Sequence, residues 1–487
     1  MVRQDRADRL FIGGRWVSGT GEVLEVVSPA TEKVIARVPS ASKADVDAAV
    51  RAARLAFDDG PWPHTPLAER LDRIRELRRL LADNQETIAR LITDEMGCPI
   101  TQSRAVQATN PLRVIDAYID IAHDYKFREV RRSETGNALV TREPVGVVAA
   151  VVPWNVPLGI SAQKVVPALI AGCSVVLKPA PQTSLDGCLF AELVEKAGFP
   201  DGVVNVVPAE REASEYLVSH PGVDKVTFTG STAAGRRIAA LCGQDMRRVT
   251  LELGGKSAAI LLDDADLGQA VETLRMGAFR NNGQICTLKT RLLVSSRREQ
   301  ELLERMEALV ASMPVGDPQD EATEIGPLFS ARQRDTVEGY LSAGRAEGAR
   351  VVVGGGRPRD PGQGWFVEPT VFAGVTPDMT IAQEEIFGPV VSVMTYEDEQ
   401  EAIATANDSQ YGLSGAVFTG DLEHGLRVAG RLRTGVVELN GSPIGLLAPF
   451  GGFKHSGIGR ENGPEGLDSY TEPRSVGLPE NLAVSLS

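Results

Sequence analysis

The chain has 487 residues, of which 43% are hydrophobic, a length that allows about three domains with more than one buried core. Its formal net charge of −14, without any stretch of clustered Lys and Arg, argues against nucleic acid as a partner. Its five cysteines and five histidines are scattered, with no Cys-x-x-Cys pair and no helical histidine pair, so we expect neither a disulfide framework nor a metal site.

The N-terminus and the most apolar stretch both bear on where in the cell the protein is expected. Arg and Asp alternate over residues 3–9, which is unlike the charged region and apolar core of a signal peptide. Residues 165–177 are the most apolar stretch, but they are too few for a membrane span and include Pro167. We therefore expect a cytoplasmic protein with no membrane segment.

In chain order, the first predicted elements are two long helices, over 43–57 and 67–96. From residue 146 onward, Val-rich runs alternate with amphipathic segments. Five of these runs are predicted strands, at 146–152, 174–177, 203–207, 225–228 and 249–253. Strands rich in β-branched residues and separated by helices indicate a parallel sheet covered on both faces, which is a doubly wound α/β domain.

A second alternating series follows Gly254 and Gly255. It predicts strands at 258–262, 292–295, 351–353, 390–395, 415–418 and 435–439. This series indicates a second doubly wound α/β domain, with a hinge near Gly254 and an active site in the cleft between the two domains. Segments 125–143 and 470–487 are predicted strands with no place in either sheet, and we expect them to pair across subunits.

Three residues are candidates for chemistry. Cys286 follows a Gly-Gln pair in a polar turn, and a thiol in such a turn is a candidate nucleophile. Glu252 lies between two leucines and precedes the double glycine, so partial burial would make it a candidate general base. Asn155, in the proline-flanked loop 153–157, offers an amide donor for an oxyanion.

Each candidate has a purely structural alternative. A cysteine is often a small buried apolar residue, as we expect for Cys173 and Cys188. Asn155 would otherwise cap the helix after Pro157, and Glu252 would otherwise pair with Lys256.

Together these segments resemble the aldehyde dehydrogenase superfamily, and the resemblance covers nearly the whole chain. Matching motifs also lie at 11–16, 228–231, 384–389, 449–457 and 469–471. The resemblance implies an NAD(P)-dependent oxidoreductase that oxidises an aldehyde to the carboxylic acid through a thiohemiacetal and a thioester on Cys286. In this chemistry Asn155 holds the oxyanion and Glu252 activates the water that releases the acid.

The resemblance also implies roles for whole segments. Residues 1–124 and 144–254 would form a Rossmann-like cofactor-binding domain, and 255–455 the catalytic domain. Segments 125–143 and 470–487 would be a small β oligomerisation element, so we expect a homodimer or a homotetramer.

Lys164 and Glu461 match family positions associated with a proton relay behind the base. The alternative is that both are simply solvated at the surface.

The expected cofactor site lacks the usual dinucleotide fingerprint, because no Gly-x-Gly-x-x-Gly follows a strand. Instead a predicted strand leads to Gly230, and Ser231 can cap the helix that follows. The N-terminal amides of that helix can receive a pyrophosphate.

The family resemblance implies further cofactor contacts. Lys178 would meet the adenosine ribose, Glu385 and Phe387 would contact the nicotinamide side, and Trp154 would line the same channel. Many NAD-preferring members carry an acidic residue where Pro181 stands. We therefore expect NAD as the cofactor, with NADP acceptable.

The substrate is an aldehyde that the sequence does not name. Arg280 stands where family members often have an apolar ring. It either binds a substrate carboxylate or another polar end of the substrate, or is an exposed arginine on a helix face. Two other functions compete. A semialdehyde dehydrogenase that acylates coenzyme A would have little use for Glu252, and a catalytically silent binding relative would be expected to lack Cys286 or Asn155.

Overall fold

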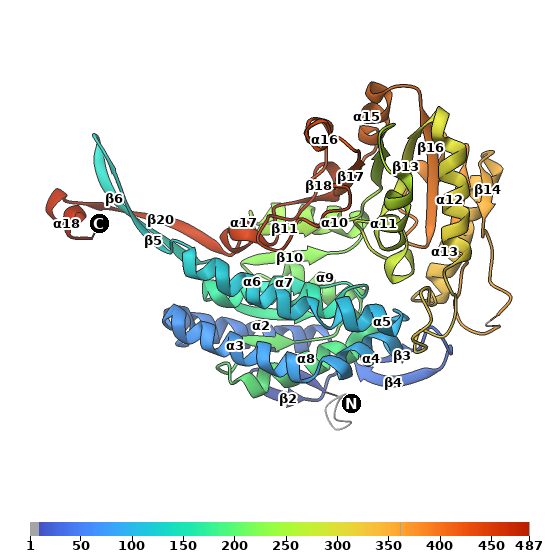
Figure 1. The fold of residues 1–487 in the computed structure, drawn as a ribbon. Helices are drawn as coiled ribbons and strands as arrows, with labels where there is room; N and C mark the ends of the chain where they lie inside the picture. Colours follow the sequence, from blue (N-terminus) through green and yellow to red (C-terminus); the bar gives the residue numbers. More distant parts are fainter. Residues whose placement is uncertain (1–8, 361, 487) are drawn as a thin grey trace.

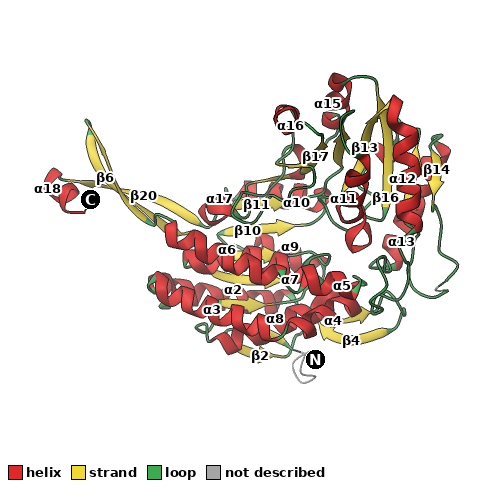
Figure 2. Ribbon diagram, in the orientation of Figure 1, coloured by secondary structure: helices red, strands yellow, loops and turns green. Residues whose placement is uncertain are grey.

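The structure, a computed structural model, describes residues 9–360 and 362–486 and is built on two large sheets (Figures 1 and 2). The order of the first sheet is β19-β11-β10-β7-β8-β9-β1-β2, and its five central strands run parallel. The strands of this sheet are β1 (Leu10–Ile12), β2 (Arg15–Val17), β7 (Val147–Val151), β8 (Ser174–Lys178), β9 (Val204–Val206), β10 (Lys225–Thr229), β11 (Arg248–Glu252) and β19 (Gly457–Ile458).

Helices cover both faces of the first sheet. Successive side chains of a strand point to opposite faces, so Val148 and Ala150 pack on one side and Val147 and Ala149 on the other. The helices of the first side are α3 (Leu67–Asp83), α4 (Gln85–Met96), α6 (Asn110–Asp124), α7 (Pro157–Ala171) and α8 (Ser184–Ala197). Those of the second side are α2 (Lys43–Asp58), α9 (Arg211–Ser219) and α10 (Thr232–Gln244).

The second sheet is also doubly wound, in the order β14-β15-β16-β13-β12-β17-β18, and only β14 is antiparallel to its neighbour. Its strands are β12 (Ser257–Leu261), β13 (Lys289–Ser295), β14 (Arg350–Val353), β15 (Thr370–Ala373), β16 (Val390–Tyr396), β17 (Ser414–Phe418) and β18 (Val436–Leu439). Its helices include α11 (Leu267–Phe279) and α12 (Glu299–Ala311) on one face, and α13 (Ala331–Ala346), α15 (Glu399–Asn407) and α16 (Leu422–Ala429) on the other.

A third sheet forms an arm that extends away from the two large sheets (Figure 1). It joins β5 (Arg128–Ser133), β6 (Gly136–Pro144) and β20 (Thr471–Leu478), so the segments predicted without a place in either large sheet pair with each other. The prediction of strand throughout 470–487 is wrong beyond Leu478, because α18 (Glu480–Leu486) is a helix.

Other predictions also need correction. The helix expected over 67–96 is two helices, since the chain bends at Asn84, where φ is −112° and ψ is 11°. The sequence did not predict β1, β2, β15, β19 or the two-stranded ribbon of β3 (Val23–Val27) and β4 (Val34–Pro39). These strands have few residues, and a short run carries little periodicity.

Two kinds of feature are absent from the part of the chain that the structure describes. No helix there is long and apolar enough to cross a membrane. Nor do three or more His, Cys, Asp or Glu side chains gather there as a set that could hold a metal ion.

Candidate active site

The candidate residues meet where the two large sheets adjoin. Glu252 is the last residue of β11 in the first sheet, and the chain then crosses through Gly254 and Gly255 to β12 of the second sheet. Cys286 lies between α11 and β13, and an added Cβ on Gly255 would come within 2.5 Å of the Cys286 carbonyl oxygen. The nucleophile and base candidates therefore approach each other from the carboxyl edge of one sheet and the amino edge of the other.

The turn before Cys286 has an unusual backbone. Asn281, Asn282 and Gly283 have φ values of 54°, 59° and 75°, three consecutive residues in the left-handed region. Asparagine and glycine tolerate this region better than other residues do. At Gly283 a side chain would also collide with the backbone of Gly388. The Asn-Asn-Gly run is thus what lets the turn form and present Cys286.

Amide side chains hold this turn in place. Asn155 Nδ2 donates to the Gln284 carbonyl at 2.9 Å, and the Asn155 carbonyl accepts from Asn281 Nδ2 at 3.1 Å and from Gln107 Nε2 at 2.9 Å. The side chain of Gln284 accepts from the Phe329 N–H at 2.9 Å. Asn155 does not cap α7, which begins without a side-chain cap, so the structural alternative for Asn155 is wrong.

Sequence reasoning assigned no role to Gln107, Asn281 or Gln284. The dense run of amides at 281–284 in otherwise apolar surroundings was a usable signal for the last two. Gln107 gives no local signal, because only the fold brings it to Asn155.

The Cys286 thiol is half-buried, and its surroundings disfavour the thiolate. Burial raises the pKa of Cys286 to about 12, and the carboxyl groups of Glu385 and Glu252 add to this shift, while Arg280 opposes it. A thiol in this state needs a partner to take its proton before it can act as a nucleophile.

Glu252 has the environment of a general base. Its residue is only 3% exposed, and neither carboxylate oxygen has a hydrogen-bond partner among the described residues. Burial, followed by the charge of Glu461, raises the pKa of Glu252 well above the usual carboxyl range. A buried carboxylate without donors is a stronger proton acceptor than a solvated one.

The alternative that Glu252 pairs with Lys256 is wrong. Lys256 Nζ is buried and, within the described chain, has no hydrogen-bond partner. Burial lowers the pKa of Lys256 to about 7, with a further contribution from Arg291.

Lys164 and Glu461 form a buried ion pair instead of being solvated. They are 0% and 4% exposed, and Lys164 Nζ also donates to Thr227 Oγ1 at 3.2 Å. Lys164 comes from α7, while Glu461 comes from the loop before α17 (Gly463–Asp468). Because Glu461 contributes to the raised pKa of Glu252, the pair is electrically coupled to the base candidate.

The carboxyl edge of the first sheet carries the expected cofactor residues. Ser231 is the N-cap of α10 and its Oγ accepts from the Ala234 N–H at 3.3 Å, as the sequence predicted. The Gly230 N–H donates to the Glu252 carbonyl at 3.0 Å, which ties this turn to the base candidate. Lys178 ends β8 with 7% exposure, and burial lowers its pKa to about 8.

The other expected cofactor residues lie beside the double glycine and the Cys286 turn. Glu385 accepts from the Gly255 N–H at 3.0 Å, and burial raises its pKa to about 7. Trp154 stacks on Phe329 with ring centroids 4.0 Å apart and meets Phe387 edge-on at 5.5 Å. Phe329 was missed because a lone phenylalanine is usually an ordinary core residue.

Arg280 is half-buried next to the nucleophile, so its interpretation as an exposed arginine is wrong. Its Nη2 donates to Thr287 Oγ1 at 3.3 Å, and Thr287 directly follows Cys286. Glu438, whose charge acts on Arg280, is paired with Lys289 at 2.7 Å. Arg280 therefore brings a positive charge to the surroundings of Cys286.

The chain matches the Aldehyde dehydrogenase family over residues 16–476. It belongs to this family. Among its relatives, geranial dehydrogenase of Castellaniella defragrans is 44% identical, over 96% of this chain and 98% of the relative. Betaine aldehyde dehydrogenase of Rhizobium leguminosarum bv. trifolii is 40% identical, over 98% of each chain. A crystal structure of Mycobacterium tuberculosis aldehyde dehydrogenase complexed with NAD+ has a TM-score of 0.95 and 46% identity, and covers 97% of this chain and 98% of that one.

The family membership confirms the general predictions from the sequence. The protein is an NAD(P)-dependent aldehyde dehydrogenase, an oxidoreductase that converts an aldehyde to a carboxylic acid. Its fold is α/β, with two doubly wound sheets and a small β element.

Proposed function

We propose that this aldehyde dehydrogenase is hydrolytic, with Cys286 as nucleophile, Asn155 as oxyanion donor and Glu252 as general base. The observation that carries the proposal is the buried carboxyl group of Glu252, which has no hydrogen-bond donor among the described residues and a raised pKa. An enzyme that passed its acyl group to coenzyme A would not need a base for water. A silent relative would have no use for a nucleophile, base and amide held together.

The first step is attack of the Cys286 sulfur on the aldehyde carbon, with the thiol proton passing to Glu252. The new oxyanion accepts hydrogen bonds from the Cys286 N–H and from Asn155. An amide nitrogen has two N–H groups, and the Gln284 carbonyl uses one of those of Asn155, so the second is available. One preorganised donor of this kind contributes about 10²–10³ in rate.

The residues at the sheet edge fit a dinucleotide. Lys178 is a nearly buried ammonium group without a hydrogen bond or ion pair to any described residue, which suits a polar ligand. We assign the adenosine ribose to Lys178, the pyrophosphate to the N-terminus of α10 at Gly230 and Ser231, and the nicotinamide side to Glu385 and Phe387. NAD held by these residues would supply the acceptor for the hydride that leaves the thiohemiacetal carbon. Trp154, which meets Phe387 edge-on, lines this side and excludes water.

The second half of the reaction releases the acid. The thioester carbon on Cys286 is attacked by water while Glu252 takes the proton, and the C–S bond breaks to return the thiol. A positioned base contributes about 10²–10⁴ in rate. Lys164 and Glu461, buried and coupled to Glu252, conduct the proton away from the base.

We also assign roles to the larger parts. The first sheet and its helices bind the cofactor, the second carries the nucleophile, and the arm of β5, β6 and β20 joins subunits into a homodimer or homotetramer. The arm supports this assignment because its two outer strands have free edges that invite pairing. The five cysteines, all unpaired, fit a cytoplasmic enzyme.

The test is NADH and NADPH formation with a panel of aliphatic, aromatic, terpenoid and semialdehyde substrates, with Cys286→Ala as the blank. Turnover that yields free acid and vanishes in the variant supports the proposal. Turnover that requires coenzyme A, or persists in Cys286→Ala, contradicts it.

A further inference from the structure

Lys178 and Glu210 lie at the same edge of the first sheet. β8 and β9 are parallel neighbours in which Leu177 pairs with Val206, so both chains leave the sheet at its carboxyl end. Lys178 ends β8, and Glu210 follows β9 at the N-cap position of α9. The backbone of Glu210 is held there by its N–H, which donates to Ser40 Oγ at 3.2 Å.

The burial of the Lys178 ammonium group suits it to bind a polar ligand. It is 7% exposed and makes no hydrogen bond or ion pair within the described residues. A charge buried in this way costs free energy unless a polar group satisfies it. Burial lowers the pKa of Lys178 to about 8, and the charge of Glu210 acts in the opposite direction.

The Glu210 side chain is free to interact with a ligand. It makes no capping hydrogen bond to α9 and no ion pair with Lys178, although the two charges interact across the edge. Position 181, three residues after Lys178, is a proline and supplies no carboxylate. Glu210 is therefore the carboxylate that acts on Lys178 here.

We infer that Glu210 and Lys178 bind the vicinal hydroxyls of the adenosine ribose from two sides, and that Glu210 selects NAD against NADP. This inference rests on the proposed function, which assigns the ribose to Lys178. The ammonium donates to one hydroxyl oxygen, and the carboxylate accepts from the other hydroxyl. A 2′-phosphate would remove that donor and place negative charge beside the carboxylate, and like charges repel each other.

The test is equilibrium binding of NADH and NADPH, followed by nucleotide fluorescence, to the wild-type enzyme and to Glu210→Gln. Glutamine keeps the size of the side chain and removes its charge. Glu212→Gln is the matched control, since Glu212 lies two residues away on α9 and is paired with Lys43 at 2.7 Å. Thermal unfolding of each variant verifies that it is folded.

We expect the wild type to bind NADH more tightly than NADPH. In Glu210→Gln this preference should fall about 10- to 100-fold, mainly through tighter NADPH binding, while Glu212→Gln keeps it within about twofold. The inference is overturned if both nucleotides bind but Glu210→Gln keeps the wild-type preference. It is also overturned if the wild type prefers NADPH, through a residue such as Arg211. In both cases the proposed function stands. If neither nucleotide binds, both are overturned.

Discussion

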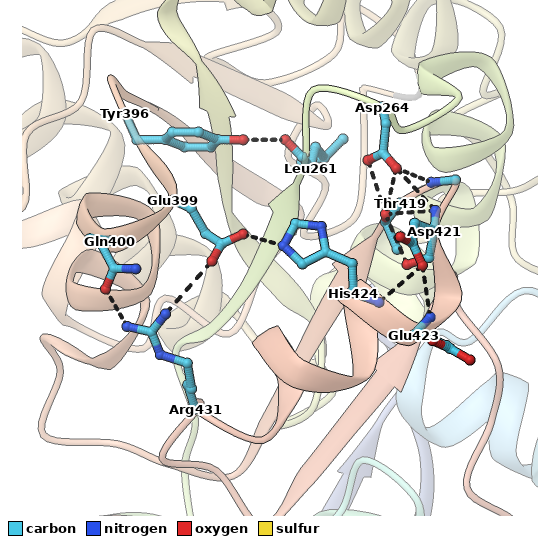
Figure 3. A network of polar contacts seen from close by, with 11 residues as sticks. Leu261, Asp264, Tyr396, Glu399, Gln400, Thr419, Asp421, Glu423, His424 and Arg431 are labelled. Carbon is cyan, nitrogen blue, oxygen red and sulfur yellow. Dashed lines mark hydrogen bonds and ion pairs between the residues drawn. The ribbon is translucent and has the colours of Figure 1, made fainter.

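The carboxyl edges of the two large sheets differ in how their polar groups are satisfied. At the first sheet, Lys178, Thr229 Oγ1 and Glu252 follow or end strands, and within the described residues their polar side-chain atoms find no hydrogen-bond partner. At the second sheet the polar groups pair with one another (Figure 3). Asp264 accepts from Thr419 Oγ1 at 2.9 Å and from two backbone N–H groups at 3.0 Å.

Other polar groups at the carboxyl edge of the second sheet are paired in the same way. Tyr396 donates to the Leu261 carbonyl at 2.8 Å, and Glu399 contacts both His424 and Arg431 (Figure 3). Ligands of parallel sheets usually bind at the carboxyl edge of the strands. Unpaired polar groups lower the stability of the fold but remain free to form hydrogen bonds with a ligand. Paired polar groups stabilise the fold and have no hydrogen-bonding capacity left for a ligand. By this rule the first edge suits a ligand better than the second.

The largest expected effect comes from removing the unpaired base. Glu252→Gln should slow both half-reactions, because glutamine takes a proton neither from the Cys286 thiol nor from water. Deacylation should slow more, by about 10²–10⁴, because water is the poorer nucleophile without a base. Stopped-flow measurement should show a burst of about one NADH per active site. Since the pKa of Glu252 is raised, wild-type deacylation should increase with pH as the group ionises, and the variant should lose this dependence. An unchanged steady state would contradict the role.

Next in size is the buried pair of the first sheet. Lys164→Met leaves Glu461 as an unpaired buried charge, which should lower the free energy of unfolding by about 3–5 kcal/mol. Lys164→Met combined with Glu461→Gln should recover much of this loss. Urea unfolding of the two variants measures both effects, and a single variant as stable as the wild type would sink the idea.

A smaller effect is expected at Arg280, which forms no ion pair with any described residue and donates to Thr287 Oγ1. For a semialdehyde that carries a carboxylate, Arg280→Met should lower kcat/KM by about 10- to 100-fold, which is the contribution of one charge-assisted hydrogen bond. For an alkanal of the same length kcat/KM should change little. Equal losses for both substrates would instead place Arg280 in the support of Cys286.

The smallest effect is expected at the carboxyl edge of the second sheet, where the polar groups pair with one another. Asp264→Asn should lower the free energy of unfolding by about 1 kcal/mol, because the carboxylate is partly solvated, and should leave kcat unchanged. Burial raises the pKa of Asp264, but hydrogen bonds from Thr419 and the backbone outweigh it, so the pKa lies below 3.8. This contribution is therefore complete above pH 3.8 and is lost as the pH falls through the folded-state pKa. A loss of activity without a loss of stability would contradict the comparison.

Much of the fold was predictable because its signals are local. The parallel strands β7 and β8 are buried on both faces, so their sequences are continuous apolar runs that any reader of the chain can find. The break between α3 and α4 was not predictable, since the apolar period continues through Asn84. The helix α18 was missed as well, because its few residues carry too little periodicity to distinguish a helix from a strand.

For the site, sequence by itself determined which residues carry reactive groups and which turns present them. Cys286, Glu252 and Asn155 stand out because polar residues at turns beside apolar strands are locally visible. Only the tertiary structure decided how deeply these residues are buried and which hydrogen bonds they make. Among the described residues Glu252 has no hydrogen-bond partner, because distant segments bury it without placing a donor beside it, and Gln107 reaches Asn155 only through the fold. Burial and pairing are properties of the folded surroundings, and they set the pKa values on which the chemistry depends.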